Sequence, residues 1–228
     1  MKRIASVMNI HFKDRWTWLI VPWGFVLCTS FLVNLIISFF LRDPLYSGGI
    51  SSIYVFALVA GILILPHTFP FVIGFSVRRT DYFLGSTAAA AVNNAIIALV
   101  LVLLAMVERH WTNGWGTDLH FFHLPYVHDG SPAEQLAMSF AVLMHLFFLG
   151  FVISSVHRRF GAVGLYTLFT ALLVILTVAG FLCTYYGWWR DIFEWLANHS
   201  AFQLAMWTVP VTALYAVASY RLLRKATV

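Results

Sequence analysis

The chain has 228 residues, of which 61% are apolar and only 10% carry a charge. Soluble globular proteins carry about 25% charged residues, and the mean hydropathy of this chain is +0.84. The composition therefore excludes a soluble globular domain and predicts a membrane protein. We attribute the net charge of +5 to membrane topology and anionic lipid, and nucleic acid is not an expected partner.

Six apolar stretches are long enough to cross about 30 Å of hydrocarbon as helices. In chain order they cover residues 16–41, 50–75, 82–107, 135–156, 163–185 and 202–220. None shows the ten-residue alternation of a barrel strand. In lipid, the other structure that provides hydrogen bonds for every backbone N–H and C=O group is a helix. We therefore expect an all-α membrane protein whose single transmembrane domain, 1–228, contains six helices.

Residues 1–15, before the first span, have the pattern of an amphipathic helix. Lys2 and Lys13 lie on one side of a helical wheel, and Met1, Ile4 and Met8 lie on the other. This pattern predicts a helix in the membrane interface. The alternative is a simple charged lead-in to the first span.

A second short helix is expected between spans five and six. In residues 187–200, GWWRDIFEWLANHS, the residues Trp188, Ile192 and Trp195 recur at helical spacing. Tryptophan prefers the membrane–water interface, so we expect an outer interfacial helix. A partial entry of this segment into the membrane stays open.

The basic residues predict the orientation of the spans. With both termini in the cytoplasm, eleven Lys and Arg residues lie inside and only Arg42, Arg109 and Arg190 lie outside. This asymmetry follows the positive-inside rule, and the inner connections, 76–81 and 157–162, are six residues each. We expect a multi-pass protein of the cell membrane, in particular the bacterial plasma membrane.

No Lys, Arg, Asp or Glu lies deep in any span. Proton- and ion-driven carriers usually keep an ionisable relay at membrane depth, so an energy source outside this chain is favoured. A P-loop needs a lysine after a glycine-rich turn, and Lys2, Lys13 and Lys225 have no such context. If ATP drives the protein, the ATPase is a separate subunit.

Histidines in an outer loop are a candidate metal site. In DLHFFHLPYVHDG, residues 118–130, the three imidazoles are His120, His123 and His128. Imidazole is a common ligand of zinc and copper, but the spacing matches no familiar motif. The interleaved aromatic residues favour a loop folded onto the interface.

Two histidines within spans are a candidate haem site. Counted from the inner span ends, His67 and His145 lie about 12 and about 16 Å deep. Similar depth on two helices would allow bis-histidine ligation of one haem. Alternatively, each histidine bonds to a neighbouring helix or lines a cavity.

Three asparagines also lie at membrane depth. Asn34 lies in span one, and Asn93 and Asn94 lie near the middle of span three. Amides at this depth seek partners across helix interfaces, so packing is their expected role. Together with His67 and His145, they are candidates for a cargo path.

The stretch GFSVRRTDYFLGST, residues 74–87, places two arginines and an aspartate between apolar runs. Thr80 or Asp81 can cap the start of span three. Arg78 and Arg79 then project into water or into a partner. The connection is short enough to transmit a movement to the helix that follows it.

This stretch resembles the first cytoplasmic loop of ABC-2 type permeases, in which a glycine, a Ser-x-Arg and an aromatic pair open the third span. The six-span topology and the two interfacial helices resemble that family as well. The resemblance implies a permease without a nucleotide site or cofactor of its own. Two permeases, copies or paralogues, would pair with two ABC ATPase subunits that bind ATP and Mg. The ATPase would contact Ser76, Arg78, Arg79, Asp81 and Tyr82, with Arg158 and Arg159 as a second candidate.

The sequence thus predicts the permease subunit of an ABC exporter, and no enzymatic activity of the chain itself. Without buried charges, the path favours a hydrophobic or amphipathic compound such as a peptide antibiotic or a lipid-like molecule. The alternative is a membrane haem or electron-transfer protein that uses His67 and His145. A third class is a sensor or assembly factor in which the spans are a scaffold.

Overall fold

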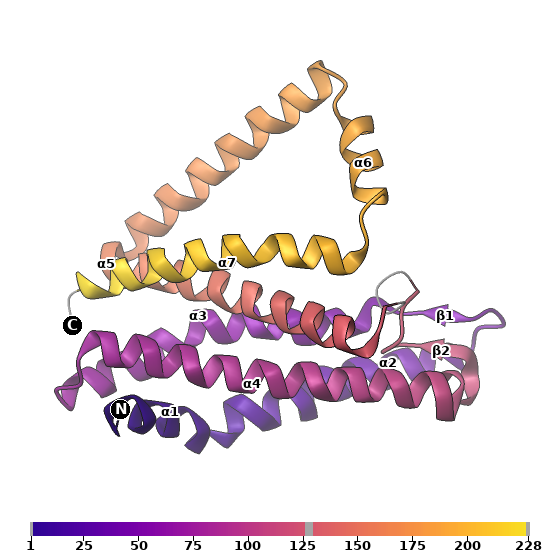
Figure 1. The fold of residues 1–228 in the computed structure, drawn as a ribbon, viewed down its shortest axis with the longest axis horizontal. Coiled ribbons are helices and arrows are strands. Elements are labelled where there is room, and N and C mark those ends of the chain that lie inside the picture. The colour runs from indigo at the N-terminus through magenta and orange to yellow at the C-terminus, as the bar shows by residue number, and fades with distance from the viewer. Residues whose placement is uncertain (1, 126–129, 227–228) are drawn as a thin grey trace.

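The computed structural model describes residues 2–125 and 130–226, and nearly all of them are helical (Figure 1). The long helices lie side by side in a bundle. The main helical elements are α1 (Lys2–Lys13), η1 (Trp16–Leu27), α2 (Cys28–Ser38), α3 (Ser51–Gly74), α4 (Arg79–Val107), α5 (Pro132–Tyr185), α6 (Trp189–Ala197) and α7 (Ala201–Arg224). The short elements are β1 (Leu45–Tyr46), η2 (Gly48–Ile50), η3 (Glu108–Thr112), η4 (Gly114–Asp118) and β2 (Leu119–His120).

Within the described ranges, five helical stretches are long and apolar enough to cross a membrane. The all-α fold of a membrane protein is therefore supported. The sequence predicts six spans. The difference lies in α5, a single helical stretch of 54 residues that contains two of the predicted spans, 135–156 and 163–185. The six-span topology stays a prediction.

Helix α5 is broken at a single residue, Gly161. Its φ of 67° and ψ of −161° belong to a region that is essentially restricted to glycine. The chain turns back at this residue, so the second half of α5 leaves the bundle at an angle (Figure 1). The expected six-residue loop at 157–162 is wrong, because the residues on either side of Gly161 remain helical.

The two expected short helices are both present. The N-terminal helix is α1, which ends at Lys13 before the long first span begins at Trp16. That span begins as a π-helix, η1, and continues as α2. The helix expected between spans five and six is α6, and it connects the divergent half of α5 to α7.

The start of α1 and the end of α7 lie at the same end of the bundle as the α3–α4 turn and the break within α5 (Figure 1). We call this the N/C end. There, Arg79 Nη1 donates a hydrogen bond to the carbonyl oxygen of Arg224, 2.9 Å away, and links the start of α4 to the last turn of α7. The opposite end carries β1 and β2, which pair in parallel through residues 45–46 and 119–120.

The core is tightest where α3 crosses the first half of α5. A Cβ added at Gly61 would lie 2.1 Å from the carbonyl oxygen of Phe147, and one at Gly150 would lie 2.1 Å from that of Leu58. Glycine at such a crossing allows two helix backbones to approach closely. This crossing holds α3 against α5, and α4 and α7 pack around the pair.

Candidate functional site

The α3–α4 turn at the N/C end contains the residues predicted to contact an ATPase. Ser76 has a left-handed φ of 56°, and its N–H donates to the carbonyl oxygen of Ile73 at 2.9 Å. Arg78 is extended and exposed, and α4 begins at the next residue. The expected side-chain cap by Thr80 or Asp81 is wrong, because no side chain caps this helix. Asp81 lies in the first turn of α4, where the helix dipole stabilises a negatively charged carboxylate.

Tyr82 belongs to the core and not to the surface of the turn. Its side chain is 0% exposed, and its hydroxyl lies 2.7 Å from Oγ1 of Thr68 on α3. Its ring meets Phe69 edge to face, with 5.1 Å between centroids. In this structure Tyr82 therefore cannot touch a partner; it fixes the start of α4 against α3.

The other predicted arginines also gather at the N/C end, but their environments differ. The guanidinium of Arg158 lies 5.4 Å from the ring centroid of Phe69, a cation–π distance, and its buried Nε has no hydrogen-bond partner. Arg159 lies 4.8 Å from the ring of its neighbour Phe160. Arg158 thus packs against the core, whereas Arg78 faces outward.

Within the part of the chain that the structure describes, no ion pair is found between a carboxylate and the basic residues of the N/C end. Among the described residues, the ion pair found joins Arg190 to Glu194 on α6, far along the chain. The N/C end combines Arg78 and Arg79 with Arg158 and the basic last turn of α7. The acids described at this end, Asp14 and Asp81, are fewer than the basic residues, so the surface is positive on balance.

Helix α1 is held against α4 by a polar contact and a close packing contact. The buried His11 Nε2 and Ser86 Oγ are hydrogen-bonded at 2.9 Å. One residue earlier on α4, a Cβ at Gly85 would lie 2.7 Å from the Cβ of Val7. Because Gly85 has no side chain, α1 approaches closely and covers the first turns of α4.

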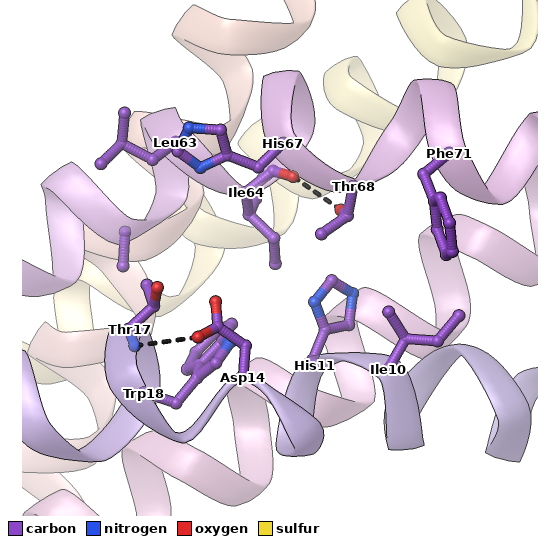
Figure 2. Close-up of a pocket in the computed structure, with 11 residues that line it drawn as sticks. Ile10, His11, Asp14, Thr17, Trp18, Leu63, Ile64, His67, Thr68 and Phe71 are labelled. Carbon is purple, nitrogen blue, oxygen red and sulfur yellow. Dashed lines mark hydrogen bonds between the residues drawn. The ribbon is translucent and has the colours of Figure 1, made fainter.

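A cavity of about 170 Å³ separates α1 from α3 (Figure 2). On one side it is lined by His11 and Asp14, and by Thr17 and Trp18 of η1. On the other side it is lined by α3, which contributes His67. The remaining lining is mostly apolar and belongs to α1 and α3: Ile10, Ala60, Leu63, Ile64, Thr68 and Phe71. The cavity is therefore an apolar hollow with a few polar groups.

The two histidines considered for haem face different elements. His67 lines the cavity beside α1, and no residue of α5 contributes to that lining. His145 Nδ1 lies 3.0 Å from Oγ1 of Thr212 on α7. His67 and His145 therefore do not frame one haem site in this structure.

The three asparagines of the expected cargo path also have separate surroundings. Asn34 accepts a 2.6 Å hydrogen bond from Ser47 and stabilises the turn before α3. Asn94 is buried and donates to Sδ of Met144 on α5 at 3.4 Å, and Asn93 is half-buried. These contacts are typical of helix packing, and the cargo path stays a prediction.

The outer histidines are only partly described. His120 stacks on Tyr46 with 4.7 Å between ring centroids, and His123 donates its backbone N–H to Glu108. His128 lies outside the described residues. Among residues that are described, no group of three or more His, Cys, Asp or Glu side chains could hold a metal ion.

Sequence analysis missed the role of Glu108 at the opposite end of the bundle. Its side chain is 1% exposed and accepts hydrogen bonds from the backbone N–H groups of residues 121–123, at 2.9 to 3.1 Å. The indole Nε1 of Trp115 donates to it at 2.8 Å. The sequence does contain one sign of this role: a carboxylate at the end of an apolar span, followed by a loop with two glycines. Glu108 thus holds the loop at residues 121–123 against the end of α4.

No protein-family model, curated protein or solved structure matches this chain. The function is therefore argued from the residues and from the geometry of the N/C end.

Proposed function

We propose that this protein is the permease subunit of an ABC exporter of the ABC-2 type. In this proposal it sits in the cell membrane with the N/C end in the cytoplasm, next to two ABC ATPase subunits and a second permease copy or paralogue. The ATPases bind ATP and Mg and hydrolyse the nucleotide. This chain supplies the path across the membrane.

The observation that carries the proposal is the concentration of short, stiff connections at the N/C end. The turn between α3 and α4 is only four residues long, and it passes directly into a 29-residue helix. Arg79 links that helix to α7, and His11 links it to α1. A push on this turn would therefore move α4 together with its neighbours, whereas a flexible loop would absorb the movement. Such a movement can shift a permease between two access states.

The side chains of the proposed coupling surface fall into two groups. Ser76 and Arg78 are exposed and free to meet a partner, and Arg79 and Asp81 are half-buried beside them. Tyr82 is buried beneath these residues and holds the start of α4 against α3. Arg158 and Arg159, one turn before Gly161, form the second and weaker contact.

The cargo path would use the apolar surface that the bundle leaves uncovered. The second half of α5 has no buried residue, and its exposed side chains include Leu173, Ile175 and Phe181. In the complex, lipid and the second permease would cover this surface. A path of this kind suits a hydrophobic or amphipathic compound, such as a peptide antibiotic or a lipid-like molecule.

Replacing Arg78 with Ala tests the coupling. Arg78 is exposed, so the fold should be retained while the contact with the ATPase is lost. We expect ATP hydrolysis by the co-purified complex to fall about tenfold, as for loss of a charge-assisted contact. Arg42→Ala, an exposed arginine at the opposite end, is the matched control and should leave hydrolysis unchanged. Equal hydrolysis in both variants, or purification of the active protein without an ATPase, would refute the proposal.

A further inference from the structure

The cavity between α1 and α3 lies near the N/C end, where the proposed topology places the boundary between lipid headgroups and acyl chains. His67 lies seven residues before the end of α3 at Gly74, which is about 10 Å along the helix axis. Leu63 and Phe71 line the cavity and are 39% and 56% exposed, so its rim continues onto the apolar surface of α3. A molecule in this cavity would therefore touch both water and hydrocarbon.

The polar groups of the cavity include the carboxylate of Asp14, the hydroxyls of Thr17 and Thr68 and two imidazoles, and neither lysine nor arginine lines it. Asp14 is exposed and uses Oδ1 to accept the backbone N–H of Thr17 at 3.1 Å (Figure 2). None of the ion pairs found among the described side chains involves Asp14. An unpaired carboxylate in a surface that is otherwise basic favours a cationic ligand.

His11 provides an independent sign that the site is incomplete. Its ring rises from α1 toward α3 (Figure 2), and only Nε2 is used, in the bond to Ser86. Nδ1 is buried without a hydrogen-bond partner, although the residue is only 1% exposed. Buried polar atoms in proteins are nearly always paired, and a polar occupant that reached the His11 side of the cavity would satisfy this one.

Two basic residues are the sequence neighbours of Asp14. Lys13 and Arg15 flank Asp14 in sequence, and both are exposed. The sequence Lys-Asp-Arg thus has one negative charge, at a residue that lines the cavity, between two positive charges on exposed neighbours. This pattern is complementary to a zwitterionic headgroup, whose ammonium would enter the cavity while its phosphate stays at the rim.

We propose that this cavity binds a phospholipid whose headgroup carries a primary ammonium, of the phosphatidylethanolamine class. A primary ammonium has three N–H donors, and Asp14, Thr17 and His67 provide acceptors in the lining. Lys13 and Arg15 bind the phosphate, and the acyl chains follow Leu63 and Phe71. A choline headgroup has no N–H donor and is excluded from these hydrogen bonds. The proposal does not depend on the transport function.

The test is native mass spectrometry of the full chain in detergent with four synthetic lipids. These carry the same acyl chains and an ethanolamine headgroup with zero, one, two or three N-methyl groups. We expect affinity to fall with each methyl group, to a total of about tenfold between ethanolamine and choline. Equal affinity for the four lipids would overturn the proposal, and this measurement needs no variant.

Asp14→Asn removes the charge and keeps an oxygen that can accept the N–H of Thr17, so the fold should persist. We expect this variant to bind the ethanolamine lipid more weakly and to show a smaller preference for it over the choline lipid, because an amide oxygen accepts a weaker hydrogen bond from an ammonium than a carboxylate does. Asp43→Asn, which changes an exposed acid at the opposite end, is the control and should keep the full preference for ethanolamine. A preference of unchanged size in Asp14→Asn, or a reduced one in Asp43→Asn, would show that the lipid binds elsewhere.

Discussion

Replacing Gly61 with Ala should destabilise the crossing of α3 and α5. The new Cβ would lie 2.1 Å from the carbonyl oxygen of Phe147 and 3.0 Å from the backbone N of Phe151. Ordinary contacts between carbon and a carbonyl oxygen are about 3.3 Å or longer. Both obstacles are backbone atoms, which cannot rotate aside as a side chain does. The helices must therefore separate locally by about 1 Å.

Such a separation has a large energetic cost because the surrounding contacts weaken with distance. A gap of about 1 Å loses up to half of the attraction between facing atoms, and the rings of Phe147 and Phe151 are fully buried at this crossing. Overpacking of a core costs about 1–3 kcal/mol, and we expect about 3 kcal/mol here. For a chain of this size, that corresponds to a melting temperature lower by about 10 °C.

Thermal unfolding in detergent, followed by tryptophan fluorescence, measures this change. Gly180→Ala is the matched control, since Gly180 is also helical, and a Cβ there meets no atom within 4 Å. We expect Gly180→Ala to unfold within about 2 °C of the unchanged protein. If Gly61→Ala and Gly180→Ala unfolded at the same temperature, close packing at the crossing would not be what holds α3 and α5 together.

Two further substitutions test the contacts at the two ends of the bundle. Glu108→Ala leaves the buried N–H groups of residues 121–123 without an acceptor, which should lower the free energy of unfolding by about 3 kcal/mol. Amide hydrogen exchange should accelerate at these residues and nowhere else. Unchanged protection there would contradict the role of this carboxylate. Gly85→Val should lift α1 from α4, because the added Cβ meets that of Val7 at 2.7 Å. Trypsin should then cleave faster after Lys13, and a rate equal to that of the unchanged protein would argue against this docking.

The helices themselves could be predicted because their signals are local. A run of apolar residues long enough to cross a bilayer has few alternatives to a helix. The spacing of Trp188, Ile192 and Trp195 is likewise enough to indicate α6. The same holds for α1, where charged and apolar residues alternate with the period of a helix.

The turns and partnerships could not be predicted because they depend on distant residues. Tyr82 sits within a charged stretch, and only the approach of Thr68 and Phe69 from α3 makes it a core residue. Glu108 has an acidic side chain in a sequence position typical of a surface, yet the loop around 121–123 encloses it. His11 likewise gains its partner from a helix 75 residues away.

Gly161 gives the second half of α5, together with α6, the geometry of a lever. The second half of α5 extends about 36 Å from this residue as a helix of 24 residues. A rotation of about 10° at its φ or ψ would therefore carry α6 through about 6 Å, while the first half of α5 stays in place. The φ and ψ of Gly161 thus set the distance between α6 and the helices of the bundle.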